Sequence, residues 1–268
     1  MSITEKVLAE RPTANELDQW IPLYSWAQER PDFHCRLNIY PRIVSRNETD
    51  RFRCRLRYFS RSAEPIGEFF TEEVTGDGVL RLPLRKAADA MGLATLDGVM
   101  EVHTFQVGAQ PATPRFLKCW MDFESEDGRW FASLPCAPFR GARKSMISPE
   151  SQVQPGIVAD DTYRTHLLAI NPMPRSASFF VTLYNAAGAP LSGFRHTLGP
   201  CDYLVRPLEE IYPDLRQHFA PGGIGSIRLD GDYKLLGWYI IENRATGRVY
   251  CMDHFAPFFR DIRSDSGL

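Results

Sequence analysis

Hydrophobic and polar residues alternate through the stretch DRFRCRLRYFSR at residues 50–61. Arginine takes every second position, at Arg51, Arg53, Arg55 and Arg57, with apolar residues between. This period of two is typical of a β-strand, because successive side chains leave opposite faces of the pleat. The pattern therefore predicts a strand with one apolar face and one face of guanidinium groups about 6.6 Å apart.

Short strand patterns follow one another along most of the chain. Turn signals such as NAAGAP and RATGR separate them, and short helices are expected at residues 85–91 and 208–218. In the second half the expected strands are residues 164–170, 178–185, 193–197, 203–206, 226–229, 235–242 and 248–254. About seven strands in about 100 residues predict an all-β fold of the antiparallel β-sandwich type, immunoglobulin- or fibronectin-like in architecture.

A repeated pattern divides the chain into two copies. The segment WMDFESEDGRWFASLPCAPFR begins at Trp120, and WYIIENRATGRVYCMDHFAPFFR begins at Trp238. Upstream, an offset of 125 residues aligns YFSRSAEPIGEFF with LYNAAGAPLSGFR. We infer an internal duplication, with tandem sandwich copies at residues 34–141 and 164–260, each packed around its tryptophan. Opposite charges after the tryptophans are expected to pair across hairpins, Glu124 with Arg129 and Glu242 with Arg248.

Three segments lie outside the two copies: an N-terminal segment, a linker between the copies and a C-terminal segment. Residues 1–33 are predicted to form a short N-terminal helical arm, because Thr13 and Glu16 have capping-box spacing. Its bulky residues Trp20, Tyr24 and Trp26 are expected either to cover the arm's own sandwich or to bind a partner protein or a second copy of the chain. Residues 142–163 are a predicted linker and residues 261–268 a C-terminal tail.

Composition and charge narrow the classes of function. The 268 residues are 44% hydrophobic and carry a formal charge of −2, so no overall field would gather nucleic acid. No apolar run reaches the roughly 18–20 residues of a transmembrane helix, and no secretory signal is evident, so we expect a cytoplasmic protein without a membrane span. The six cysteines contain no CxxC pair and are expected to be free thiols. No cofactor motif is present, and no cofactor is expected.

The arginine face allows three interpretations. At the offset of 125 the second copy has serine, serine, phenylalanine and threonine in place of the four arginines, so the fold does not require arginine there. The first interpretation is a salt-bridge ladder, in which Arg57 faces Glu68 and Arg53 faces Glu72. The second is a partner surface. The third is a binding site formed by Arg51, Arg53, Arg55 and Arg57 for an anionic small molecule or glycan.

The histidines offer one further candidate site. The segment CMDHF places Asp253 and His254 where the first copy has apolar residues. A catalytic or metal site here would need His103, His166 or His196 to come close in space, with His254 as the candidate metal ligand. No zinc-binding spacing is present, so no metal site is predicted from spacing alone. The alternative is a hydrogen-bonded histidine at a strand end.

These observations favour a non-catalytic binding or assembly protein over an enzyme. The alternative is an enzyme, possibly metal-dependent, with its site in a groove between the two sandwiches. A second alternative is a binder of an anionic small molecule or glycan on the arginine strand.

Overall fold

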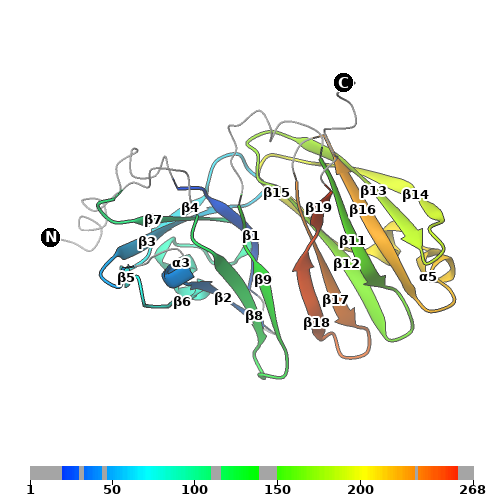
Figure 1. Ribbon diagram of the computed structural model, residues 1–268, viewed down its shortest axis with the longest axis horizontal. Coiled ribbons are helices and arrows are strands. Elements are labelled where there is room, and N and C mark those ends of the chain that lie inside the picture. The colour runs from blue at the N-terminus through cyan, green and yellow to red at the C-terminus, as the bar shows by residue number, and fades with distance from the viewer. Residues whose placement is uncertain are drawn as a thin grey trace. The chain divides into compact units, whose positions relative to one another are not determined.

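The computed structural model describes residues 20–29, 33–43, 47–109, 116–138, 150–232 and 235–258. The chain divides into two compact units, residues 1–140 and 141–268, and the all-β prediction is confirmed because both consist mainly of antiparallel strands (Figure 1). No helix in the described segments has the length and apolar character needed to cross a bilayer.

Unit 1 contains two antiparallel sheets. The first has the order β10-β1-β7-β3-β4, with β5 also paired to β3, and its strands are β1 (Leu23–Gln28), β3 (Arg51–Phe59), β4 (Gly67–Phe70), β5 (Val74–Thr75), β7 (Asp97–Gln106) and β10 (Ala137–Pro138). The second has the order β6-β2-β8-β9, with β2 (Phe33–Ile39), β6 (Leu80–Pro83), β8 (Cys119–Ser125) and β9 (Phe131–Pro135). A 3-10 turn, η1 (Pro41–Ile43), follows β2, and helix α3 (Leu84–Ala90) follows β6 where a helix was expected.

Strand β3 shows how the sequence pattern becomes packing. Its apolar positions Phe52, Cys54, Leu56 and Tyr58 are all buried, while the arginines between them face the other way. The predicted alternation is therefore confirmed. Burial of this apolar face supplies the driving force that holds β3 in its sheet.

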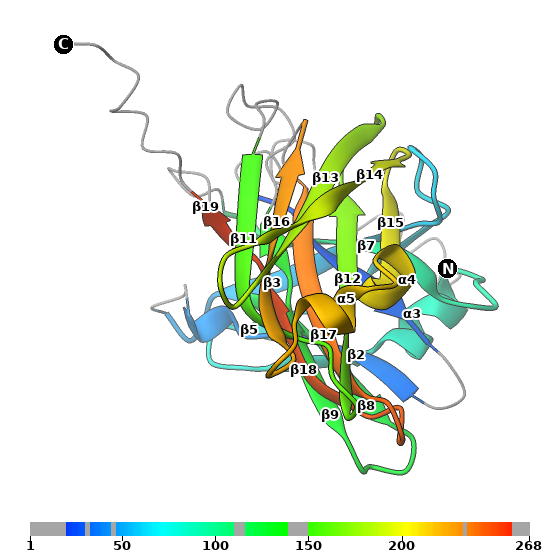
Figure 2. The same cartoon turned by 90° about the vertical axis from the view of Figure 1, so that its right-hand side faces the viewer.

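Unit 2 also contains two antiparallel sheets. The first has the order β14-β13-β16-β11-β19, with β11 (Glu150–Val158), β13 (Ala177–Asn185), β14 (Pro190–Leu198), β16 (Ile224–Gly231) and β19 (Ala256–Phe258). The second has the order β15-β12-β17-β18, with β12 (Tyr163–Asn171), β15 (Asp202–Pro207), β17 (Leu236–Asn243) and β18 (Val249–His254). Helix α4 (Leu208–Ile211) packs beside β12 and β15, and α5 (Leu215–His218) follows it (Figure 2).

One hydrophobic core joins the two sheets of unit 2. Phe179 and Leu229 enter it from the first sheet, and Leu167 and Tyr239 enter it from the second. The sheets therefore bury their facing sides against each other.

Both units have the same strand order. Read in one direction, β10-β1-β7-β3-β4 corresponds to β19-β11-β16-β13-β14, and β6-β2-β8-β9 corresponds to β15-β12-β17-β18. The pairing register then identifies equivalent residues. Trp120 lies opposite Asn38 and Pro135, just as Trp238 lies opposite Leu168 and His254.

Two of the predicted boundaries need correction. Residues 1–33 are not a helical arm throughout, because residues 23–28 form β1; the capping-box residues Thr13 and Glu16 lie outside the described residues. The predicted linker, 142–163, contains all of β11. Strand β1 lies inside its sheet and is buried at all six positions, so it lacks the alternation that marks a half-exposed strand. Strand β11 is obscured by Pro155 and a bulge beside it.

The two tryptophans differ in burial. Cys119, Met121 and Phe123 of β8 are buried. Trp120 points to the opposite face of the strand and is only half-buried. Trp238 is fully buried but is not a member of the core cluster of unit 2. The prediction that each sandwich packs around its tryptophan is therefore wrong for Trp120.

Candidate ligand-binding site

An open depression of about 410 Å³ lies on the outward face of unit 1. Its lining residues are Tyr40, Trp120, Asp122, Phe131 and Ser133. Trp120 and Asp122 lie on β8, and Phe131 and Ser133 lie on β9. Successive side chains of a strand leave opposite faces, so these four point outward while their neighbours along each strand point into the core. The antiparallel register places Asp122 directly opposite Ser133.

Three aromatic side chains form the apolar part of the depression. The rings of Tyr40 and Trp120 meet edge to face, with centroids 5.3 Å apart and planes at 77°. This contact fixes the orientation of the indole. Phe131 is 56% exposed. Large apolar side chains exposed around a concave surface are typical of a place where a ligand or partner binds.

A carboxylate held in place forms the polar part. Asp122 Oδ1 accepts a hydrogen bond of 2.8 Å from the Ser133 hydroxyl, and Oδ2 accepts one of 2.5 Å from Asn38 Nδ2. Arg36 Nε lies 3.9 Å from Oδ2, and Arg36 Nη2 lies 3.4 Å from Glu124 Oε2. Each carboxylate oxygen can accept a second hydrogen bond, so Asp122 has acceptor capacity left for a ligand.

Unit 2 offers an internal control, because the pairing register identifies the equivalent residues there. Trp120 corresponds to Trp238, which is fully buried. Three other lining positions correspond to apolar, buried residues: Tyr40 to Ile170, Asp122 to Ile240 and Ser133 to Met252. Phe131 corresponds to Val249, which is half-buried. The scaffold therefore does not require half-exposed aromatic and polar residues at this face.

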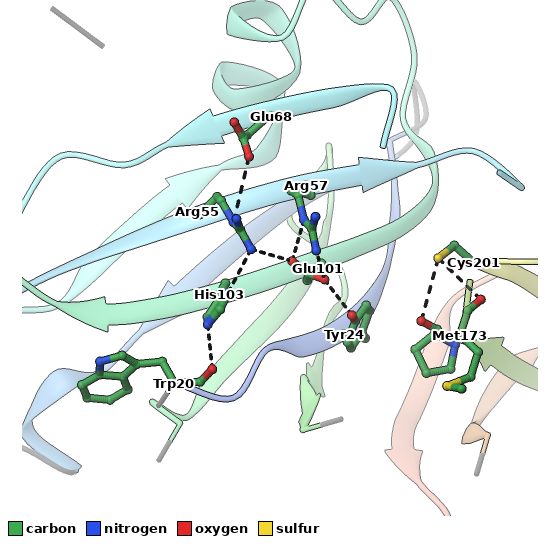
Figure 3. Close-up of polar contacts among 10 residues, drawn as sticks. Trp20, Tyr24, Arg55, Arg57, Glu68, Glu101, His103, Met173 and Cys201 are labelled. Atoms are coloured by element: carbon green, nitrogen blue, oxygen red, sulfur yellow. Dashed lines mark hydrogen bonds and ion pairs between the residues drawn. The ribbon is translucent and has the colours of Figure 1, made fainter. Parts of the chain in front are cut away.

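The predicted arginine site lies on β3, where the structure gives the arginines protein partners. Strand register places Arg57 opposite Glu68 as predicted, but the ion pair of Glu68 is with Arg55, whose Nε lies 4.0 Å from Glu68 Oε1. The strongest ion pair, however, reaches the other neighbouring strand. Arg57 Nε and Nη2 donate to the two carboxylate oxygens of Glu101 on β7, at 2.8 and 2.7 Å (Figure 3).

Glu101 is the centre of a buried polar network. Its side chain is 2% exposed and also accepts a hydrogen bond of 2.7 Å from the Tyr24 hydroxyl, while Arg55 Nη2 lies 3.5 Å away. Burial raises the pKa of Glu101, but the hydrogen bonds and charge of Arg57 outweigh this and hold the pKa below its ordinary value. Burial and the neighbouring charge of Arg57 lower the pKa of Arg55.

His103 extends this network. Its Nδ1 lies 3.0 Å from Arg55 Nη2, which can only donate, so Nδ1 is the acceptor. The Nε2 atom then carries the proton and donates to the Trp20 carbonyl oxygen at 2.7 Å. Contacts on both ring nitrogens make His103 part of the packing of unit 1.

The other two arginines of β3 also have partners. Arg51 Nη1 lies 3.2 Å from Glu73 Oε2, and Arg53 Nε donates to the Thr71 carbonyl oxygen at 3.0 Å. The predicted pairing of Arg53 with Glu72 is wrong, because β4 ends at Phe70 and Glu72 instead pairs with Lys86 at 2.9 Å. All four guanidinium groups of the predicted anion site thus already have contacts within the protein.

The histidine candidates of unit 2 have separate partners. Asp253 Oδ1 and His254 Nδ1 are 2.7 Å apart on an exposed part of β18. His166 Nε2 instead lies 2.6 Å from Glu242 Oε2. Among the described residues, no group of three or more histidine, cysteine, aspartate and glutamate side chains is arranged to hold a metal ion.

The charges expected to pair across hairpins also have other partners. Glu242 pairs with Arg164 at 2.8 Å as well as with His166, and Arg129 pairs with Asp127 at 3.2 Å. Glutamates at the ends of β8 and β17 thus contact the neighbouring strand β2 or β12 rather than the turn. The hairpin prediction is therefore wrong.

The residues expected to meet a partner protein are buried within the structure. Trp20, Tyr24 and Trp26 are 4%, 7% and 5% exposed. Trp26 stacks on Phe123 with ring centroids 5.5 Å apart. These three side chains are therefore not available as a contact surface.

Sequence reasoning missed Glu101 and the depression. A signal for Glu101 is present, because Glu101 and His103 are the only ionisable residues in the interior of an apolar strand, VMEVHTF. Apolar and polar residues alternate around Trp120, and this alternation is a signal for the depression. From the sequence alone, however, Trp120 is interpreted as part of the core. Neither signal indicates which strands lie side by side.

Comparisons with known proteins give no assignment. No protein-family model matches the chain, and no curated protein matches it. Among solved structures, a Bacteroides uniformis β-glucuronidase matches at 10% identity and a TM-score of 0.18, covering 86% of this chain and 25% of that one. Bacteroides uniformis β-glucuronidase 2, covalently bound to cyclophellitol-6-carboxylate aziridine, matches at 8% identity and a TM-score of 0.16, with the same coverage. The chain thus spans a quarter of the length of these structures, and likeness this weak carries no argument about function.

Proposed function

We propose that this protein is a non-catalytic binding protein whose ligand site is the depression lined by Tyr40, Trp120, Asp122, Phe131 and Ser133. One observation carries the proposal: the depression combines half-exposed aromatic rings with an oriented carboxylate, whereas the residues of unit 2 equivalent to Tyr40, Trp120, Asp122 and Ser133 are apolar and buried. Pockets that hold small molecules are mostly apolar with a few placed polar groups, and commonly measure about 300–1,000 Å³. A small organic molecule fits this description.

We further infer that the units are β-sandwiches of immunoglobulin or fibronectin type that arose by duplication. The shared strand order and the shared tryptophan segments support this inference. A cytoplasmic, reducing location is also our proposal. It is supported by the free thiols of Cys119 in β8 and Cys136 between β9 and β10, whose backbones are joined by a hydrogen bond of 3.1 Å.

The site is tested by a ligand screen with matched variants. NMR titration of the full-length protein uses a panel of neutral sugars, quaternary amines, amino acids and nucleosides. We expect a member of the panel to perturb the Trp120 indole signal and to lose affinity at least tenfold in Trp120→Ala. The control is Tyr250→Ala, which removes an aromatic side chain that is 75% exposed in unit 2. Equal affinity in Trp120→Ala and in the control, or no binding of any panel member, contradicts the proposal.

A further inference from the structure

We propose that the depression binds a neutral sugar ring, stacked on the indole of Trp120 and hydrogen-bonded through its hydroxyl groups to Asp122 and Ser133. This inference rests on the proposed function and names its ligand class. Two parts of its lining support this inference: an aromatic wall formed by Tyr40, Trp120 and Phe131, and a polar wall formed by Asp122 and Ser133.

The aromatic wall matches the apolar side of a sugar. A pyranose ring with equatorial hydroxyl groups presents axial C–H groups on its faces, and these faces pack against aromatic rings. Trp120 supplies a large flat surface of this kind. Tyr40 holds the indole edge to face at 5.3 Å, so little side-chain freedom is lost when a ligand binds. Phe131, 56% exposed at the rim, adds a second apolar contact.

The polar wall matches the hydroxyl groups. A carboxylate can accept hydrogen bonds from two neighbouring hydroxyl groups, and Asp122 is held for this by Ser133 at 2.8 Å and Asn38 at 2.5 Å. The Ser133 hydroxyl donates its hydrogen bond to Asp122, so the lone pairs of its oxygen can accept a hydrogen bond from a ligand hydroxyl. Asp122 and Ser133 thus offer only acceptors, which suit a ligand rich in O–H donors.

The local charges disfavour ionic ligands. A phosphate or carboxylate ligand would meet the charge of Asp122 at close range. A quaternary ammonium ligand suits aromatic rings. However, Arg36 already lies 3.9 Å from Asp122 and 3.4 Å from Glu124, and its positive charge offsets part of the attraction of these carboxylates for a cation. A neutral polyol avoids both penalties.

The volume limits the size of the ligand. About 410 Å³ accommodates one or two sugar rings but not a long glycan in full. Because the depression is open, further rings of a longer chain would extend into solvent. We therefore expect the site to recognise one ring or a disaccharide unit within an oligosaccharide.

The experiment combines an array of immobilised neutral oligosaccharides with calorimetric titration of cellobiose, maltose and lactose. Choline chloride and glucose 6-phosphate serve as the cationic and anionic probes. The variants are Trp120→Ala, Trp120→Phe and Asp122→Asn, with Tyr250→Ala as the control, and circular dichroism establishes that each is folded. We expect wild type and the control to bind a neutral oligosaccharide equally. Affinity should fall at least tenfold in Trp120→Ala, and less in Trp120→Phe.

The outcomes separate the two proposals. One outcome is that choline or glucose 6-phosphate binds, that no neutral sugar binds, and that the binding is lost in Trp120→Ala. This outcome contradicts the proposal of a neutral sugar ligand and supports the proposal of a binding site. Sugar binding that is unchanged in Trp120→Ala and in Asp122→Asn overturns the placement of the sugar in this depression. Absence of binding to every probe and to the whole array overturns both proposals.

Discussion

Arg57 holds Glu101 with two hydrogen bonds across neighbouring strands, from Nε at 2.8 Å and from Nη2 at 2.7 Å. The strand register also sets the two residues directly opposite each other. The pair combines a planar donor fork with a planar acceptor, which is the strongest form of ion pair between side chains. Because Glu101 is almost fully buried, its charge depends on these contacts.

Loss of the Glu101 charge should therefore destabilise the protein. Glu101→Gln removes the carboxylate charge that binds Arg57 and lies 3.5 Å from Arg55, and we expect the free energy of unfolding to fall by about 3 kcal/mol. Urea denaturation measures this change. Glu73→Gln is the matched control, because it removes the partner of exposed Arg51 and should cost about 0–1 kcal/mol. If the two variants were equally stable, the buried pair would not hold β3 and β7 together.

A second prediction concerns acid stability. The hydrogen bond from His166, opposed by burial and aided by Arg164, lowers the pKa of Glu242 from 4.5 to about 2. A carboxyl group whose pKa is depressed in the folded state stabilises that state above its unfolded pKa, and loses the contribution as pH falls through the folded pKa. Wild type should thus be more stable than Glu242→Gln at pH 7, and the difference should shrink between about pH 4.5 and pH 2. Denaturation of both proteins across this range tests the claim, and a difference independent of pH would contradict it.

A third prediction concerns the tautomer of His103. Since Arg55 can only donate to Nδ1, the imidazole should be neutral with its proton on Nε2. Two-dimensional NMR that correlates ring carbon-bound protons with both nitrogens distinguishes this form. A proton found on Nδ1, or on both nitrogens at neutral pH, would show that Arg55 does not contact His103 as described.

A fourth prediction concerns Gly225 of β16. A β-carbon at this position would overlap the Phe219 ring and lie 2.5 Å from the Tyr184 carbonyl oxygen. Phe219 is 1% exposed and the carbonyl belongs to the neighbouring strand, so neither can move freely. Gly225→Ala should cost about 1–3 kcal/mol in thermal or urea unfolding. At Gly199 a β-carbon would lie 3.6 Å from its nearest neighbour, an ordinary contact with Asp202, so Gly199→Ala should cost clearly less.

The sequence predicted those features that depend on neighbours along the chain. The alternation in β3 gave its strand and its buried face, and the short turn after it gave the opposition of Arg57 and Glu68. Strand β1 could not be found in this way, because a strand buried on both faces has no polar side to alternate with.

Such patterns could not predict contacts between strands that are distant in the chain. Glu101 meets Arg57 only because β7 lies beside β3, although the two residues are 44 positions apart in the chain. The depression likewise needs β8 and β9 to lie beside the residue that follows β2. The repeated tryptophan misled the interpretation, since Trp120 and Trp238 share a position in the strand order but have different surroundings.

Among the described strands of each unit, the first pairs directly with the last, β1 with β10 and β11 with β19. The start of the first of these strands and the end of the last are therefore only about one strand spacing, 4.8 Å, apart. A short peptide could join them, and new ends could be opened at a surface turn elsewhere, so each unit is a natural candidate for circular permutation or for insertion into a loop of another protein.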